Sequence, residues 1–132
     1  MQPTKGSRVS KLEALIAELV HATAGAEGAA VADIATGITL ARTGEPGFDL
    51  DVAAQGFAAA VRQQLRTVQD DLGLVAPAEA TLFTQGSHHH VIGVRTHDNR
   101  EGLFVYLVVR RDGAALSAVR RRVALVARRL PL

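Results

Sequence analysis

Residues 28–40 hold two short apolar segments on either side of a tight turn, and a long amphipathic segment follows soon after them. Val31 and Ile34 belong to the first segment, and Ile38 and Leu40 belong to the second. Gly37 and the small residues before it suit a tight reversal, so this stretch predicts a β-hairpin. A hairpin followed by an amphipathic helix is typical of folds in which helices pack on an antiparallel sheet.

Three segments of the chain have the periodicity and the end signals of helices. Ser10 and Glu13 form a capping box, which predicts that a first helix begins at residue 10. Asp49 or Asp51 can cap a second helix, which is expected to run to about residue 72, where Gly73 stops it. A last helix is expected to open at Asp112 and to end at Pro131.

Three more strands are expected, over residues 81–85, 88–96 and 103–109. The last of these is the most continuously apolar run, which predicts that it is the central strand. The order therefore predicts an α+β fold of the form α-β-β-α-β-β-β-α, with a five-stranded, mainly antiparallel sheet covered by helices. We expect a flexible N-terminus over residues 1–9 and a single domain over residues 10–132.

Composition limits the class of protein. The chain has 132 residues, of which 48% are hydrophobic, and it has no cysteine, so we expect one domain with a core that needs no disulfide or thiolate metal site. No apolar run approaches the roughly 20 residues of a membrane helix, so we expect a cytoplasmic protein with no membrane partner. Arginines crowd the C-terminal end, but no aromatic residues alternate with them, so we expect no nucleic-acid partner.

The second predicted helix has distinct faces when its residues are placed at 100° intervals. Phe57, Val61, Leu65, Val68 and Leu72 form the expected core stripe. A ridge of small or uncharged residues beside it would let another helix approach closely, although Gly56 in this ridge could instead accommodate the domain's own sheet. Together with an edge strand over residues 81–85, the ridge predicts a homodimer interface. Its predicted residues are Ala53, Gly56, Ala60, Gln64, Thr67, Leu82, Phe83 and Thr84.

A polar stripe lies on the other side of the same helix. It consists of Gln55, Arg62, Arg66 and Gln69, and its two arginines repel each other mildly at a spacing of four residues. An acidic partner would relieve this repulsion, so the stripe is the predicted partner-binding surface. The region of Arg121, Leu125 and Arg128 is the next candidate, and Leu125 is expected to point away from the core.

No sequence pattern for catalysis or phosphate binding is present, so we expect no enzymatic activity, no catalytic residue and no cofactor. His88 and His90 share one face of a strand and could both reach one metal ion, with His97 or Asp98 approaching across a turn. Two imidazoles alone make a weak site, so we expect no tight metal binding. The role of His88, His89 and His90 stays open at this point.

Two motifs carry a resemblance to a known family. Asp33, Thr36, Gly37 and Leu40 match the Asp-x-x-Ser/Thr-Gly-x-x-Leu turn of Roadblock/dynein light-chain domains, and residues 49–54 match a helix entry of the stand-alone actinobacterial members. The chain therefore resembles this family, including its bacterial MglB-type members, and the order of elements from residue 10 to residue 130 agrees. These motifs are structural and say little about ligands.

The resemblance implies a non-enzymatic homodimeric regulator or adaptor that acts on or with a small Ras-like GTPase. MglB-type proteins accelerate their GTPase without an arginine finger, so neither Arg62 nor Arg66 is assigned that role. One alternative is a scaffold module without a nucleotide switch, and a weaker one is a small-ligand or metal-binding domain. The sequence does not distinguish activation, exchange and anchoring of the GTPase.

Overall fold

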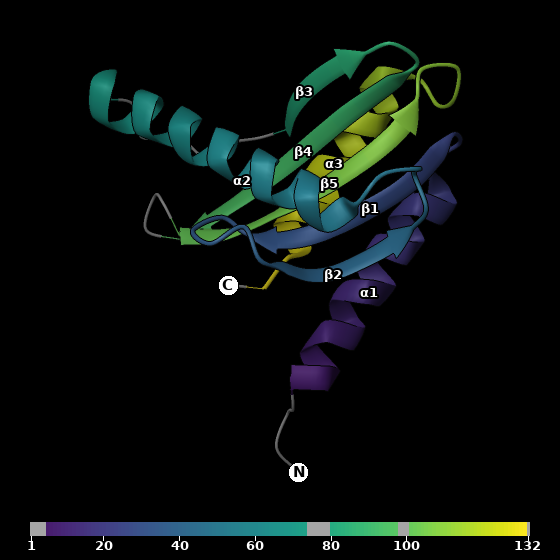
Figure 1. Cartoon of the computed structure of the whole chain (residues 1–132), viewed down its shortest axis with the longest axis horizontal. Coiled ribbons are helices and arrows are strands. Elements are labelled where there is room, and N and C mark those ends of the chain that lie inside the picture. Colours follow the sequence, from purple (N-terminus) through teal and green to yellow (C-terminus); the bar gives the residue numbers. More distant parts are fainter. Residues whose placement is uncertain (1–4, 74–79, 98–100, 132) are drawn as a thin grey trace.

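The structure is a computed structural model that describes residues 5–73, 80–97 and 101–131. Its elements in chain order are α1 (Lys5–Ala22), β1 (Ala26–Asp33), β2 (Thr39–Gly44), α2 (Leu50–Arg66), the π-helical turn η1 (Thr67–Asp71), β3 (Ala80–Gln85), β4 (His88–His97), β5 (Glu101–Arg110) and α3 (Leu116–Arg129) (Figure 1). This order confirms the α-β-β-α-β-β-β-α fold expected from the sequence.

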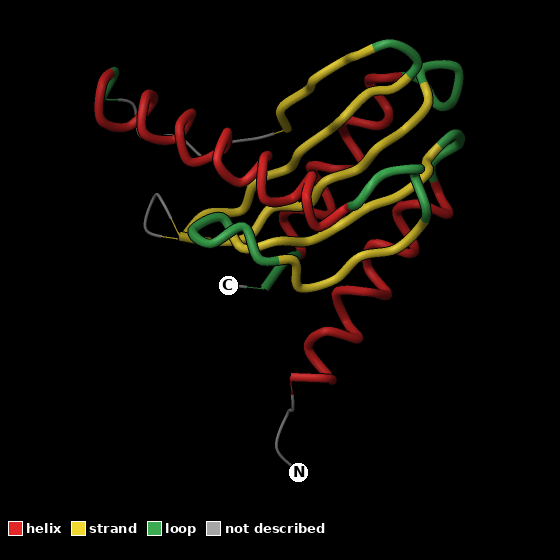
Figure 2. Tube along the Cα trace, viewed as in Figure 1, coloured by secondary structure: helices red, strands yellow, loops and turns green. Residues whose placement is uncertain are grey.

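The strands form one antiparallel sheet in the order β2-β1-β5-β4-β3. The most apolar strand, β5, lies at the centre as predicted, and it pairs with β1 on one side and with β4 on the other. Strands β2 and β3 form the two edges of the sheet. Helices α1 and α3 cover one face of the sheet, and α2 crosses the opposite face (Figure 2).

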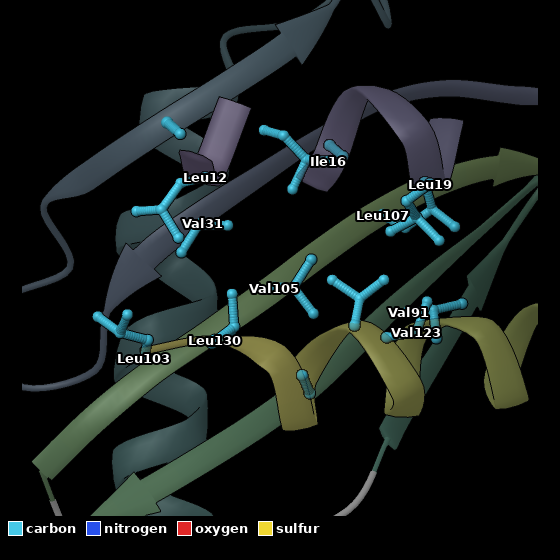
Figure 3. Packing of buried hydrophobic residues seen from close by; sticks show 14 of the residues in the cluster. Leu12, Ile16, Leu19, Val31, Val91, Leu103, Val105, Leu107, Val123 and Leu130 are labelled. Atoms are coloured by element: carbon cyan, nitrogen blue, oxygen red, sulfur yellow. The ribbon is translucent and has the colours of Figure 1, made fainter. Parts of the chain in front are cut away.

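Each face of the sheet has its own apolar core. Leu12, Ile16 and Leu19 of α1 pack with buried residues of the central strands and of α3 on the first face (Figure 3). On the second face, Phe104 and Tyr106 of β5 are fully buried with residues of α2. Because alternate residues of β5 point to opposite faces, its continuous apolar run serves both cores.

The predicted hairpin is held by the residues that carry the family resemblance. Asp33 Oδ2 accepts hydrogen bonds from the backbone N–H of Thr36 at 2.9 Å and from its hydroxyl at 2.8 Å. Gly37 has φ = 74° and donates its N–H to the Asp33 carbonyl at 2.8 Å, a backbone conformation that favours glycine. Ile34 and Ile38 lie in this turn rather than in strands, and Ile38 is 59% exposed.

Two predicted helix starts are wrong. α1 begins at Lys5, so Ser10 lies inside the helix instead of capping it, and the half-buried Val9 continues the apolar stripe. α3 begins at Leu116 rather than at Asp112. Before it, the Ala114 N–H donates to the Ala24 carbonyl at 2.7 Å, which ties this segment to the turn between α1 and β1.

The predicted cap of α2 is confirmed, but its predicted core stripe is only partly correct. Asp49 Oδ1 accepts from the backbone N–H of Asp51 at 2.8 Å. The core face consists of small as well as large residues, namely Leu50, Ala54, Ala58, Val61 and Leu65. Phe57 and Val68 are half-buried.

Leu72 does not join this core, and it is 61% exposed. The π-helical turn after Arg66 changes the helical phase, and this end of the helix projects past the sheet (Figure 1).

Candidate protein-interaction surface

Strand β3 presents an open edge of the sheet. It pairs only with β4 among the described strands, and Phe83 on it is 56% exposed. Thr84 is also exposed, and its hydroxyl lies 2.8 Å from Nδ1 of His89 on β4. The side chain of Leu82 lies outside the described part of the structure. An edge strand with unpaired backbone groups is suited to pairing with another strand.

The ridge on α2 is exposed at its centre and half-buried at both ends. Gly56, Ala60 and Gln64 are exposed, and Ala53 and Thr67 are half-buried. A Cβ atom built on Gly56 would meet nothing within 4 Å. The domain's own sheet therefore does not require glycine at this position, which removes the intramolecular explanation for Gly56.

An aromatic cluster joins the β3 edge to the ridge side of α2. His90 of β4 lies at its centre, with ring centroids at 5.8 Å from Phe57 on α2, 6.2 Å from Phe83 on β3 and 6.1 Å from Phe48 before α2. Tyr106 stacks on His90 at 5.8 Å, and its hydroxyl lies 2.6 Å from His90 Nδ1. Because Phe48 and Phe83 remain exposed, this cluster reaches the surface of the molecule both at the edge strand and before α2.

The polar stripe lies on the other side of α2, next to the β1–β2 turn. Gln55 and Arg66 are exposed, whereas Arg62 and Gln69 are half-buried. Arg62 Nη1 donates to the carbonyl of Ile34 at 2.7 Å and to that of Ala35 at 3.3 Å. Arg62 thus fastens the turn to the helix, a structural role that the sequence did not predict.

Replacing Arg62 by alanine is expected to lower the free energy of unfolding by about 1.5–3 kcal/mol, because a charged donor is lost and a half-buried carbonyl is left without it. Arg66→Ala is the matched control, since Arg66 is exposed and its loss should change stability by no more than about 0.5 kcal/mol. Urea unfolding followed by circular dichroism measures both. Equal stability of the two variants would contradict the role given to Arg62.

Sequence reasoning missed two exposed apolar residues beside the polar stripe. Val52 on α2 is 64% exposed, and Ile38 at the end of the β1–β2 turn is 59% exposed. The turn packs closely on the helix, because a Cβ on Gly37 would lie 3.2 Å from Cα of Gln55. The position of Ile38 directly after the turn motif could have indicated its exposure, but the sequence analysis placed Ile38 in a strand. The partner-binding candidate therefore gains an apolar component.

The three consecutive histidines have separate partners rather than one shared site. His88 pairs with Glu27 of β1, His89 with Thr84 and His90 with Tyr106. Within the described residues, no group of three or more histidine or acidic side chains is placed to hold a metal ion. The side chain of His97 and all of Asp98, which the sequence offered as further ligands, lie outside the described residues. Weak metal binding stays a prediction, which zinc calorimetry can test.

His90 is expected to make stability depend on pH. Burial lowers its pKa from the ordinary value of 6.5, and the nearby His88 and His89 add to this effect. The unfolded chain therefore binds a proton at a higher pH than the folded chain does. The contribution of neutral His90 to the free energy of unfolding should be fully present above about pH 6.5. It should fall as the pH drops from there toward the lowered pKa.

The variant His90→Gln should remove this part of the pH dependence, because glutamine does not titrate. Urea unfolding at several values between about pH 5 and pH 8 measures the slope. His21→Gln, at the exposed end of α1, controls for the loss of a histidine elsewhere. If His90→Gln keeps the slope of the unchanged protein, the titration belongs to another group.

In the part of the chain that the structure describes, no helix combines the length and the apolar character needed to cross a membrane.

Comparison with known proteins identifies the fold. No protein-family model and no curated protein matches the chain in sequence. Among solved structures, a Roadblock/LC7 domain from Streptomyces avermitilis is 15% identical with a TM-score of 0.67, over 89% of this chain and 92% of that one. Myxococcus xanthus MglB is 13% identical with a TM-score of 0.69, over 98% and 90% of the two chains.

A further structure, described as MglB with a tetrameric arrangement, is 17% identical with a TM-score of 0.67, over 98% of this chain and 93% of that one. These likenesses span nearly the whole chain and include every helix and strand that positions the candidate surface. The resemblance seen in the sequence is confirmed at the level of structure, and the chain has the Roadblock/LC7 fold.

Proposed function

We propose that this chain is a non-enzymatic homodimeric regulator or adaptor that acts on or with a small Ras-like GTPase. The observation that supports it most is the fold shared with MglB over 98% of the chain, joined to a surface that suits protein contact. MglB-type proteins regulate a small GTPase, as the family resemblance implies. A structural neighbour described as MglB with a tetrameric arrangement also supports self-association.

The proposed dimer forms through β3 and the ridge on α2. A two-fold axis at the β3 edge pairs this strand with its copy, and the ridges then meet across the same axis. The exposed rings of Phe48 and Phe83 lie between these two contacts, where they can supply buried apolar area. Stable dimers commonly bury on the order of 1,600 Å² in total, which a paired strand together with a paired helix can reach.

The proposed GTPase contact uses the other side of α2. Gln55 and Arg66 provide polar groups, and Ile38 and Val52 provide exposed apolar ones. Dimerisation places two copies of this surface in one assembly, which presents a larger basic and apolar platform to an acidic partner.

Titration with purified GTPases tests this function. Small Ras-like GTPases of the same organism, loaded with GDP or with a GTP analogue, are each titrated into the protein by calorimetry. Binding of one of them should weaken with added salt. Arg66→Glu should weaken it by about tenfold, because the reversed charge repels an acidic surface.

Arg8→Glu makes the same charge change on α1, across the sheet from the proposed contact, and should leave the affinity unchanged. No binding by any of these GTPases would contradict the proposed function and would favour a scaffold without a nucleotide switch.

A further inference from the structure

The outer face of α3 is a basic surface without acidic residues. Arg121 and Arg128 are exposed at its centre, Arg120 and Arg129 are exposed on its two flanks, and α3 contains no aspartate or glutamate. None of these four side chains forms an ion pair or a hydrogen bond among the described residues. Leu125 lies among them and is 52% exposed. We call these five residues the α3 basic face.

Packing fixes the α3 basic face firmly to the sheet. Val119, Val123 and Val126 of the opposite helix side are buried. Arg95 of β4 donates from Nη1 to the carbonyl of Arg128, which holds the C-terminal end of α3. The exposed arginines therefore belong to a rigid helix. A ligand that binds them does not have to order this helix first, so binding avoids that entropy cost.

The α3 basic face points away from α2. Helix α3 packs on β4 and β5 on the face of the sheet opposite to α2 (Figures 1 and 2). A surface bound by α3 thus leaves the α2 side free for the proposed GTPase. If two chains pair along β3, as the proposed dimer requires, the same axis brings both α3 helices to one side of the assembly. Only this doubling rests on the proposed function, because each chain has its own basic face.

The chemistry of the α3 basic face suits phosphate groups on an apolar surface. A guanidinium group binds phosphate through two parallel hydrogen bonds. Each basic residue near an anionic membrane also adds to the electrostatic attraction between protein and lipid. Leu125 offers an apolar side chain between the arginines. The four phenylalanines and the one tyrosine of the chain lie away from this face, in the α2-side core and the cluster around His90. None of these phenylalanine and tyrosine rings is thus available here to stack on nucleic-acid bases.

We infer that the α3 basic face is a peripheral docking surface for a bilayer that contains anionic phospholipids. The sequence predicted no membrane partner because no segment can span a bilayer. Peripheral docking requires no such segment, since the arginines lie at the level of the lipid phosphates while α3 remains packed on its own sheet. Two α3 basic faces on one side of a dimer match an extended flat surface better than they match one small acidic protein.

Co-sedimentation with vesicles tests this inference. The full chain is mixed at about 0.05 M salt with vesicles of phosphatidylcholine alone or with added phosphatidylglycerol. We expect binding only to the anionic vesicles, and release as salt is raised. Arg121→Gln with Arg128→Gln should weaken binding by about fivefold for each arginine, or roughly 25-fold for the pair.

The control is Arg66→Gln with Arg110→Gln, which removes the same charge from α2 and from the end of β5 and should change binding by no more than about twofold. Failure to bind anionic vesicles, equal binding to neutral ones, or equal loss in the control would overturn the inference. Tighter, arginine-dependent binding to an RNA duplex would also overturn it. Light scattering on the same protein without vesicles gives its mass and so tests the dimer separately. Arginine-dependent vesicle binding by a monomer would support the docking surface and contradict the dimer.

Discussion

Gly56→Leu should weaken self-association by roughly 30-fold to 25,000-fold while it leaves the folded chain at least as stable as before. Overpacking a close contact costs about 1–3 kcal/mol, and a symmetric interface incurs the cost twice. Within one chain the added side chain has open space, since nothing lies within 4 Å of a Cβ on Gly56. Replacing an exposed helical glycine should even stabilise the helix by about 0.5–1 kcal/mol.

The two effects of Gly56→Leu have opposite signs, so they can be separated. Analytical ultracentrifugation over a range of concentrations gives the dissociation constant, and urea unfolding at low concentration gives the stability of the chain. Ala59→Leu is the matched control, because Ala59 is exposed on α2 but lies off the ridge. An unchanged dissociation constant in Gly56→Leu would remove the ridge from the interface.

Gly93→Val is expected to lower the free energy of unfolding by about 3 kcal/mol. Gly93 lies in β4 beneath α3, where a Cβ would come within 2.9 Å of Val123 Cγ1 and within 3.0 Å of Ala127 Cβ. The Val123 carbonyl oxygen also lies at 3.0 Å, so a rotamer change alone cannot make room. The helix must move off the sheet, and its buried contacts with β4 and β5 would loosen.

Chemical denaturation of Gly93→Val beside Gly93→Ala measures this effect. The alanine variant should lose less stability, because it adds one methyl group where valine adds a branched side chain. A valine variant as stable as the unchanged protein would show that α3 does not lie closely on β4.

These two glycines show where sequence reasoning ends. Both stand inside regular elements, where glycine costs stability, so the sequence indicates that each needs a reason. The reason depends on atoms far away in the chain: Gly93 faces α3 of its own chain, whereas Gly56 faces open space. Local sequence does not contain this information.

Two features that depend on local chemistry were predicted well, although the equally local capping box at Ser10 gave a wrong helix start. Asp33, Thr36 and Gly37 form their turn through hydrogen bonds within a few residues, and Asp49 caps α2 in the same manner. The apolar run of β5 identified the central strand, because a strand with helices on both faces must be apolar on both.

Features set by distant contacts were predicted poorly. The start of α3 is delayed by a backbone hydrogen bond from Ala114 to Ala24. The exposure of Leu72 follows from a π-helical turn and from the end of the sheet beneath it. The role of Arg62 depends on carbonyls 27 and 28 residues away in sequence. Only the three-dimensional structure therefore shows that, in the polar stripe, Arg62 has a structural role whereas Arg66 is exposed.

The mass of the protein in solution tests the proposed homodimer, on which the partner surface depends, most directly. Light scattering coupled to size exclusion, at micromolar concentration and moderate salt, distinguishes one chain of 13.9 kDa from a pair. We predict twice the mass of the single chain for the unchanged protein and a shift toward the single-chain mass for Gly56→Leu. A single-chain mass for the unchanged protein would contradict the homodimer and the regulator built on it.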